Sequence, residues 1–259
     1  MLRLVAVVVL IGAGALAATG WLERALVYPF DPREAPPPAG LVETRLATGD
    51  GEVLVVWSAR AAPGRPTVLY FHGNAGNLAV RATRFAAFTA RGYGLVAAGY
   101  RGSSGSTGTP SETALIADAE TLVAALPALA GPGARVYYGE SLGAAVAIAL
   151  AVRRPPDALV LEAPFASLAE MSRAVYGTPA LARLARSRWP SRARIAQVSV
   201  PLYILHGAAD PLVPPAQGRA VYDAAASAQK TFDLVAGAGH VDVWQPDAQR
   251  RLFAFLGGI

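Results

Sequence analysis

The chain has 259 residues, of which 53% are hydrophobic and 16% are charged, a composition that suits one large α/β domain with a substantial core. It contains no cysteine, which excludes disulfides and thiolate metal sites. The net charge is +5, but the basic residues are almost all scattered arginines without a basic motif, so no nucleic-acid partner is predicted.

The amino-terminal segment is apolar enough to enter a membrane. A run of 19 uncharged residues, Leu4–Leu22, follows Arg3 and would span about 28 Å as a helix, close to the hydrocarbon thickness of a bilayer. Ala15–Ala17 offers the cleavage site of a signal peptide, but the apolar run continues past it. We predict an uncleaved single-pass anchor over residues 1–25. The charge of Arg3 favours a non-cytoplasmic domain, on the periplasmic side in a bacterium.

The next elements predict a tether and an α/β domain. Residues 26–40 contain five prolines and are predicted to form an extended tether, followed by a single domain over residues 41–259. The segments VETRLA and EVLVVWSA flank the turn TGDG, which predicts a hairpin. Short apolar strands then alternate with helices, predicting a mostly parallel sheet with helices on both faces. The predicted strands are 67–71, 94–99, 135–139, 157–162, 201–206 and 230–235, and the predicted helices are 78–90, 111–126, 142–153, 216–226 and 246–256.

One insertion, residues 166–200, interrupts this alternation. It has a helical pattern, and in an α/β domain an excursion of this length is expected over the carboxyl ends of the strands, as a small helical cap. Its many arginines predict a solvated helical face. An alternative is a cap that contacts anionic headgroups or an acidic substrate.

A candidate nucleophile lies between the strand RVYYG and the helix that follows it. Residues Gly139–Gly143 read GESLG, a G-x-S-x-G pattern in which Ser141 occupies the tip of a sharp strand-to-helix turn. The glycines are needed because the neighbours of the tip are crowded. The helix start also leaves the Leu142 N–H free to stabilise an oxyanion beside Ser141.

A serine nucleophile needs a base, and three histidines are available. In this topology the expected chain order is serine, acid, histidine, so only His206 and His240 can follow Ser141. His240 lies in a loop with acidic residues on both sides and is the predicted base. For His206, at the end of a strand, we predict a backbone hydrogen bond that shapes the next turn, and for His72 a structural role in its loop.

The predicted acid is Asp210, which follows the strand PLYIL and could accept a hydrogen bond from the Nδ1–H of His240. Two alternatives remain. Glu162 ends the preceding strand, a position that some triads use. Asp242 is two residues from His240 and more easily caps the next helix or pairs with an arginine.

The glycine-rich turn HGNAGN follows the strand TVLYF, where a second oxyanion donor is expected, and the Asn74 N–H is the candidate. A phosphate-binding loop is not predicted, because the sequence contains no GxxxxGK[ST] pattern. No cluster of metal-ligating residues is apparent, and no cofactor is expected. Tyr100 and Arg101, in the loop GYRGSSG, are candidates either for the pocket lining or for a structural role.

Together, HGNAGN, the YRG-S-x-G loop, GESLG, LEAPFASL, VPLYILHGAADPLVP and GAGH resemble the α/β-hydrolase superfamily. The resemblance extends from about Leu26 to the carboxyl end and is strongest to the membrane-anchored Bem46-like group, with its ABHD13-type relatives and bacterial members labelled serine-aminopeptidase-like. It implies an eight-stranded, mostly parallel sheet, a triad of Ser141, Asp210 and His240, and oxyanion amides at Asn74 and Leu142. The group commonly has asparagine after the base, whereas Val241 stands here.

These observations predict a monomeric, membrane-tethered serine hydrolase that cleaves acyl esters or thioesters, of the carboxylesterase or thioesterase kind, through an acyl-enzyme. Two alternatives are a catalytically silent binding protein with the same fold and an aminopeptidase-like hydrolase. The fold itself does not define a substrate.

Overall fold

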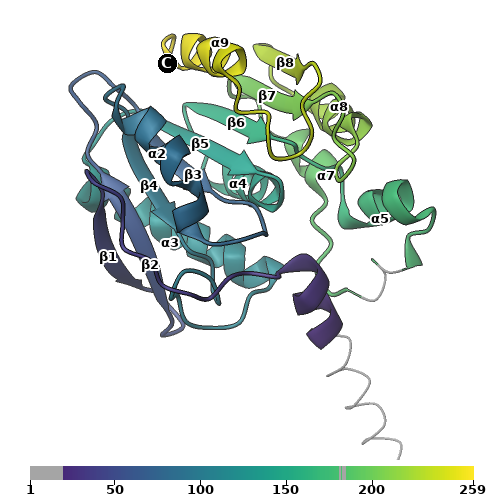
Figure 1. Ribbon diagram of the computed structural model, residues 1–259, viewed down its shortest axis with the longest axis horizontal. Coiled ribbons are helices and arrows are strands. Elements are labelled where there is room, and N and C mark those ends of the chain that lie inside the picture. The colour runs from purple at the N-terminus through teal and green to yellow at the C-terminus, as the bar shows by residue number, and fades with distance from the viewer. Residues whose placement is uncertain (1–19, 181, 183–184) are drawn as a thin grey trace, which may run out of the picture.

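The computed structural model describes residues 20–180, 182 and 185–259, so most of the predicted membrane anchor lies outside the described residues. Eight strands form one sheet in the order β1-β2-β4-β3-β5-β6-β7-β8 (Figure 1). The strands are β1 (Val42–Ala47), β2 (Val53–Ala59), β3 (Thr67–Phe71), β4 (Gly94–Ala98), β5 (Arg135–Glu140), β6 (Ala158–Glu162), β7 (Leu202–Gly207) and β8 (Lys230–Val235). The labelled helices are η1 (Leu78–Arg81), α2 (Ala82–Thr89), α3 (Glu112–Ala130), α4 (Leu142–Arg153), α5 (Leu168–Tyr176), α7 (Ser191–Ile195), α8 (Pro215–Ala224) and α9 (Pro246–Leu256). Residues 20–27 are also helical.

The sheet is mostly parallel, as predicted. Strands β3 to β8 pair in parallel, while β1 and β2 form the predicted hairpin and add antiparallel pairs at one edge. The register aligns Phe71 with Gly139, Glu140 with Glu162, and Gly207 with Val235. The segments that follow these parallel strands therefore all begin at the same edge of the sheet, where ligands bind in open α/β sheets.

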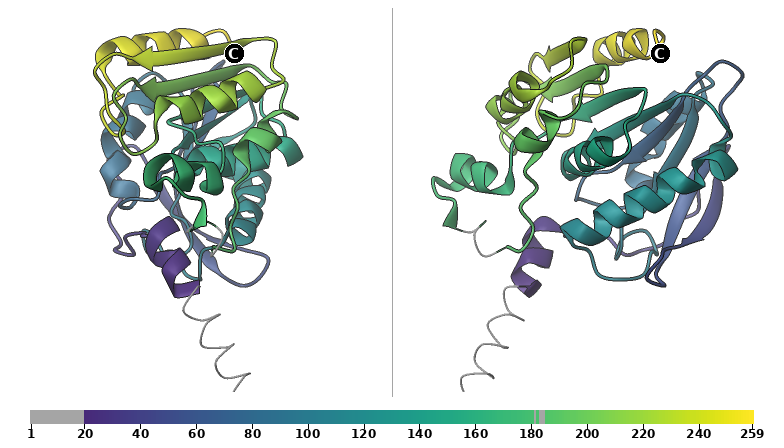
Figure 2. Two further views of the ribbon diagram at one scale, coloured as in Figure 1. Left: turned by 90° about the vertical axis from the view of Figure 1, so that its right-hand side faces the viewer. Right: turned by 180° about the vertical axis from the view of Figure 1, so that it is seen from behind.

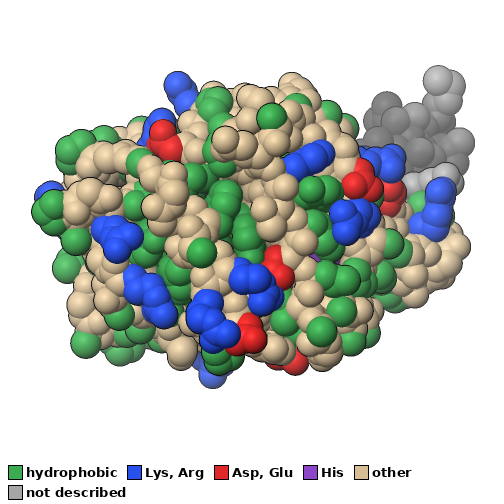
Figure 3. All heavy atoms as spheres, turned by 90° about the horizontal axis from the view of Figure 1, so that it is seen from above, with side chains coloured by type: hydrophobic (Ala, Val, Ile, Leu, Met, Phe, Trp, Pro, Cys, Tyr) green, Lys and Arg blue, Asp and Glu red, His purple; other side chains and the backbone are tan. Residues whose placement is uncertain are grey.

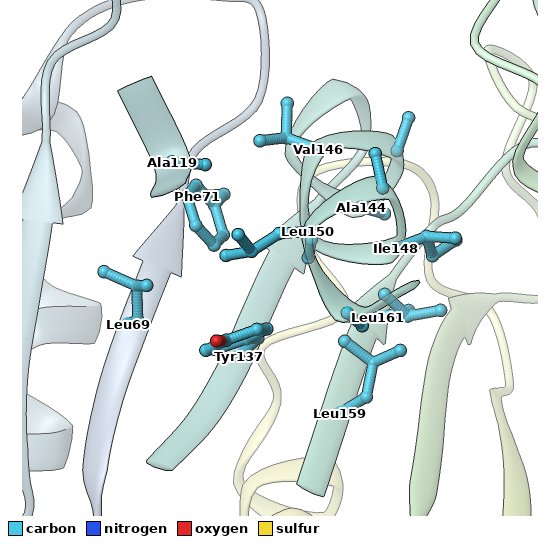
Figure 4. Packing of buried hydrophobic residues seen from close by; sticks show 14 of the residues in the cluster. Leu69, Phe71, Ala119, Tyr137, Ala144, Val146, Ile148, Leu150, Leu159 and Leu161 are labelled. Carbon is cyan, nitrogen blue, oxygen red and sulfur yellow. The ribbon is translucent and has the colours of Figure 1, made fainter. Parts of the chain in front are cut away.

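Helices cover both faces of the sheet, as the alternation of elements predicts (Figure 2). Successive side chains of a strand point to opposite faces, so Tyr137 packs on one side with α3 and α4, while Val136 and Tyr138 pack on the other with α2 and α9. Figure 4 shows α4 packed over the strands, with Leu150 next to Phe71 of β3. This helix is buried over nearly its whole length, so the residue that precedes it is held by the core.

Among the described residues, α3 is long and apolar enough to cross a membrane by length and composition. Its residues Leu115, Ala119, Leu122 and Leu126 are buried in the main core cluster. We therefore assign α3 as a core helix of the domain.

The insertion between β6 and β7 contains α5 and α7, and several of its arginines make contacts within the chain. Arg192 pairs with Glu170 at 3.2 Å, and Arg194 pairs with Glu112 at 2.7 Å. Arg188 Nη1 donates hydrogen bonds to two backbone carbonyl oxygens of the insertion. On the face drawn in Figure 3, basic side chains are interspersed with acidic and hydrophobic ones rather than gathered in one patch.

Candidate active site

The turn between β5 and α4 has the sharp strand-to-helix geometry predicted from the GESLG pattern. Ser141 has φ 53° and ψ −111°, a conformation that side-chain-bearing residues rarely adopt and that costs roughly 1–3 kcal/mol. Its N–H donates to the Glu162 carbonyl at 2.8 Å. Steric constraints require glycine at both flanking positions, Gly139 and Gly143. A Cβ at Gly139 would lie 2.4 Å from the Gly143 oxygen, and one at Gly143 would lie 2.0 Å from the Phe71 oxygen.

The turn after β7 and the loop after β8 bring a carboxylate and an imidazole together. His240 Nδ1 donates to Asp210 Oδ2 at 2.7 Å, and the Asp210 side chain is fully buried. The other oxygen, Oδ1, accepts the amide hydrogens of Leu212 and Val213 at 2.9 and 2.8 Å. Burial acts to raise the pKa of Asp210, but hydrogen bonds from His206, His240 and the Val213 amide outweigh it and hold that pKa well below its usual range. The carboxylate therefore stays ionised and orients His240.

The two alternative acids make other contacts. Glu162 accepts hydrogen bonds from the Tyr138 hydroxyl and from Arg84. Asp242 accepts the Gly239 N–H at 2.6 Å, a local contact within the loop. Of the three candidates, Asp210 is the one that the structure joins to His240.

The remaining histidines make the backbone contacts that the sequence suggests. The ring of His206 is fully buried, and its Nε2 donates to the Val213 carbonyl at 2.8 Å, which fixes the turn that carries Asp210. His72 Nδ1 donates to the Gly73 carbonyl at 2.7 Å, and the Tyr100 hydroxyl donates to the His72 carbonyl at 3.0 Å. Burial lowers the pKa of His72 to about 3, so its ring is neutral.

Ser141 opens into an apolar cavity of about 240 Å³. Asn74 and Leu142, the two predicted oxyanion donors, line the same cavity. Neither backbone N–H has a hydrogen-bond partner among the described residues, so both are available to a ligand. Within the same residues no hydrogen bond joins the Ser141 hydroxyl to His240. Catalytic hydrogen bonds are often long in the absence of substrate and shorten when it binds.

A buried ionic network behind Ser141 was not foreseen from the sequence. Glu140 receives two hydrogen bonds from Arg81, at 2.8 and 3.1 Å, and one from the Tyr70 hydroxyl at 2.9 Å. Arg81 also donates to the carbonyl oxygens of Ala75 and Asn77, in the loop that carries Asn74. Arg81 thus links the Ser141 turn to the HGNAGN loop. Glu140 lies within the GESLG motif, and Arg81 follows the HGNAGN motif closely. Their positions beside these motifs were the signal in the sequence that could have identified the pair.

Arg101 has a structural role. Its guanidinium donates to both oxygens of Asp118 at 2.7 and 2.8 Å, and it also contacts Asp50. Across the described residues, no group of three or more His, Cys, Asp or Glu side chains is placed to hold a metal ion.

Comparison with known families gives a match over most of the domain. The family model described as serine aminopeptidase, S33, matches residues 62–194 and 191–243. An uncharacterized protein of Mycobacterium tuberculosis (strain ATCC 25618 / H37Rv) is 38% identical over 253 residues, covering 93% of this chain and 88% of that protein. Protein bem46 of Schizosaccharomyces pombe is 34% identical over 198 residues, covering 73% of this chain and 66% of its own length.

Lysophosphatidylserine lipase ABHD12 of Rattus norvegicus is 32% identical over 194 residues. The match covers 67% of this chain and 48% of the lipase, so the chain spans about half the length of that relative. Among solved structures, the Pyrococcus furiosus esterase Pf2001 superposes with a TM-score of 0.71 at 18% identity, covering 88% of this chain and 98% of the esterase. The esterase RhEst1 from Rhodococcus sp. ECU1013 gives 0.64 at 16% identity, covering 84% and 98%. At these identities the structural likeness shows the fold.

Proposed function

The chain belongs to the serine aminopeptidase S33 family as a Bem46-like α/β-hydrolase, and from this premise we propose that it is a serine hydrolase of acyl esters or thioesters. One observation carries the proposal. The Asp210–His240 pair, joined at 2.7 Å, follows strands whose carboxyl ends share an edge with the Ser141 turn, and Ser141 opens into an apolar cavity. Apolar lining with a few polar groups suits a substrate with an aliphatic acyl part.

In the proposed reaction the Ser141 hydroxyl attacks the acyl carbonyl while His240 Nε2 takes its proton. The ionised Asp210 keeps the His240 Nδ1–H in place and stabilises the imidazolium that forms. The backbone N–H groups of Asn74 and Leu142 stabilise the oxyanion, and the positive end of α4 adds to this effect. His240 then protonates the leaving group, and a water molecule that it deprotonates hydrolyses the acyl-enzyme.

Labelling with a fluorophosphonate probe tests this proposal. The wild-type chain is expected to be labelled, and Ser141→Ala is expected to lose the label. Ser172→Ala is the matched control, because Ser172 lines the same cavity but its hydroxyl donates to the Thr178 carbonyl at 2.7 Å. Labelling that persists in Ser141→Ala, or is absent from the wild type, would contradict the proposed nucleophile. It would favour a catalytically silent binding protein.

The cavity gives less support to an aminopeptidase. Such an enzyme needs a free carboxylate for the substrate ammonium group, and Glu23 is the only acidic residue among the described cavity-lining residues. Both of its oxygens already accept backbone amide hydrogens, from Arg186 and Ser187. A comparison of p-nitrophenyl esters with aminoacyl p-nitroanilides separates the two activities, and preferential turnover of the anilides would overturn the ester assignment.

We also propose the predicted organisation of the whole chain. It comprises an anchor over residues 1–25, a tether over 26–40 and a monomeric catalytic domain over 41–259 with its cap at 166–200, located on the non-cytoplasmic side. Support comes from the uncharged run Leu4–Leu22. Alkaline carbonate extraction of membranes is expected to leave the protein in the pellet. Release into the supernatant would contradict the anchor.

A further inference from the structure

The helical residues 20–27, the first residues that the structure describes, form one wall of the cavity beside Ser141. Leu22, Leu26 and Val27 line the same cavity as Ser141, and residues four apart on a helix share a face. Figures 1 and 2 show this short purple helix next to the connection that leads from α5 to α7. The last residues of the predicted membrane anchor and the first residues of the predicted tether therefore form part of the cavity wall.

Buried hydrogen bonds fix this helix to the insertion. Glu23 is 8% exposed, and its two carboxylate oxygens accept the amide hydrogens of Arg186 and Ser187, each at 2.9 Å. Burial acts to raise the pKa of Glu23, but these hydrogen bonds outweigh it and lower that pKa, so the carboxylate remains ionised. The Tyr28 hydroxyl bonds to Ser187 Oγ at 2.6 Å and accepts from Trp189 Nε1 at 3.1 Å.

The same segment touches the loop that carries the oxyanion donor. Asn74 Nδ2 donates to the Val27 carbonyl at 3.3 Å, and the Asp31 N–H donates to the Gly76 carbonyl at 3.2 Å. Segment 20–31 thus bonds on one side to the insertion and on the other to the loop beside Ser141. These contacts restrain the wall on both sides, and a wall whose position is fixed in advance can select ligands by their length.

Exposed apolar side chains from several elements border the cavity. Leu26 is 54% exposed, and the lining also includes Val175 and Tyr176 of α5 and Leu212 of the turn after Asp210, which are 38%, 65% and 52% exposed. Exposed large hydrophobic residues gathered around one opening mark an apolar binding site. The charged group at this wall, Glu23, already accepts two backbone amide hydrogens, so the wall offers a ligand the apolar side chains of Leu22, Leu26 and Val27.

We propose that residues 20–27 form the wall against which an unbranched aliphatic acyl chain lies, and that Leu26 sets the length of chain that the enzyme accepts. This inference rests on the proposed esterase function and narrows it to esters of medium and long acyl chains. Each methylene buried against the wall is expected to raise kcat/KM by about fourfold, until the chain outgrows the cavity.

The test uses the full-length chain in a fixed concentration of detergent. The substrates are p-nitrophenyl esters whose acyl groups contain two, four, eight or twelve carbons. Leu26→Trp, which fills the opening, is expected to lower kcat/KM for the two longer esters at least tenfold and to leave the acetate within twofold. Leu26→Ala is expected to shift the preference towards the twelve-carbon ester. Ala25→Trp is the matched control, because Ala25 is exposed on the same helix and does not line the cavity.

The outcomes separate this inference from the function on which it rests. A chain-length profile that is the same in wild type, Leu26→Trp and Leu26→Ala would overturn the inference while leaving the esterase function intact. Equal loss in Ala25→Trp and Leu26→Trp would overturn it as well, since the effect would not come from the cavity. Absence of fluorophosphonate labelling and of turnover of every ester in the wild type would instead refute the esterase function.

Discussion

Replacing Arg81 with methionine tests whether the link between the Ser141 turn and the HGNAGN loop stabilises the fold and the site. Methionine keeps an unbranched apolar stem but removes the guanidinium, which is 7% exposed and donates to Glu140 and to the loop carbonyls. The variant leaves Glu140, whose side chain is 16% exposed, without its closest cation. Arg84 remains 3.8 Å from the carboxylate and compensates in part.

The magnitude follows from the burial of the ion pair. Burial acts to raise the pKa of Glu140, yet hydrogen bonds and charge from Arg81, with further effects of Arg84 and Tyr70, lower it from its usual 4.5 to about 2. Breaking a buried ion pair by removing one partner costs about 3–5 kcal/mol, and the nearby Arg84 places this variant at the lower end. We expect Arg81→Met to lower the free energy of unfolding by about 3 kcal/mol.

The direction in which this stabilisation changes with pH follows from the lowered pKa of Glu140. Because the folded pKa lies below the unfolded one, the stabilisation is fully present above pH 4.5 and is lost as pH falls towards 2. Wild type and Arg81→Met should therefore differ most at neutral pH and converge in acid. Urea unfolding followed by tryptophan fluorescence measures both. Arg250→Met is the control, since Arg250 is 72% exposed in its pair with Asp247 and should change stability by less than about 0.5 kcal/mol.

A result in which Arg81→Met unfolds at the same urea concentration as the control at neutral pH would refute this reasoning.

The same variant also allows a kinetic test. If Arg81 positions the Asn74 and Leu142 amides, kcat should fall while KM changes little, because the oxyanion exists only in the transition state. A rise in KM alone would indicate a disturbed cavity instead of a disturbed oxyanion site.

Two further predictions concern single groups. Asp210→Asn should lower kcat about 10⁴-fold with the fold intact, because the amide no longer holds the required His240 tautomer. The control Asp242→Asn should keep kcat within a few fold of the wild type, as measured with p-nitrophenyl esters. Equal losses in the two variants would argue against Asp210 as the acid. Burial lowers the pKa of His72 to about 3, so below pH 6.5 the unfolded chain binds a proton at this residue and the folded chain does not. The free energy of unfolding should therefore drop by about 2 kcal/mol between pH 7 and pH 5. His72→Asn should flatten that part of the urea-derived pH profile, and an unchanged slope would show that another group is responsible.

Features set by local rules were predictable from the sequence. The strand-to-helix turn at Ser141 follows from two glycines at fixed spacing and from apolar runs on either side, and its geometry is confirmed. The hairpin, the parallel strands and the helices on both faces follow from the alternation of short apolar and amphipathic segments, and they too are confirmed. To predict the pairing of Asp210 with His240, it was enough to expect that the carboxyl ends of parallel strands lie at one edge of the sheet.

Contacts between distant residues were not predictable in this way. Arg81 and Glu140 are 59 positions apart, and Glu23 bonds to residues more than 160 positions away. The proline-rich segment 26–40 illustrates the reason. Prolines do give an extended backbone, but an extended backbone can still pack, and here Tyr28 is buried while Phe30 pairs with Gly76 by a β-bridge. Composition predicts the local conformation of such a segment, and the partner surface decides whether it packs.

The two kinds of feature meet at the proposed oxyanion site. The two proposed donor amides, at Asn74 and Leu142, belong to different loops, and each loop is defined locally by glycines that the sequence shows. The distance between the two amides has no local determinant. We expect it to depend on Arg81, which bonds to Glu140 beside Ser141 and to the HGNAGN loop, and on segment 20–31, which bonds to the Asn74 loop and to the insertion. Because stabilisation of an oxyanion falls steeply with donor geometry, these long-range contacts should affect turnover more than the identity of either amide-bearing residue does.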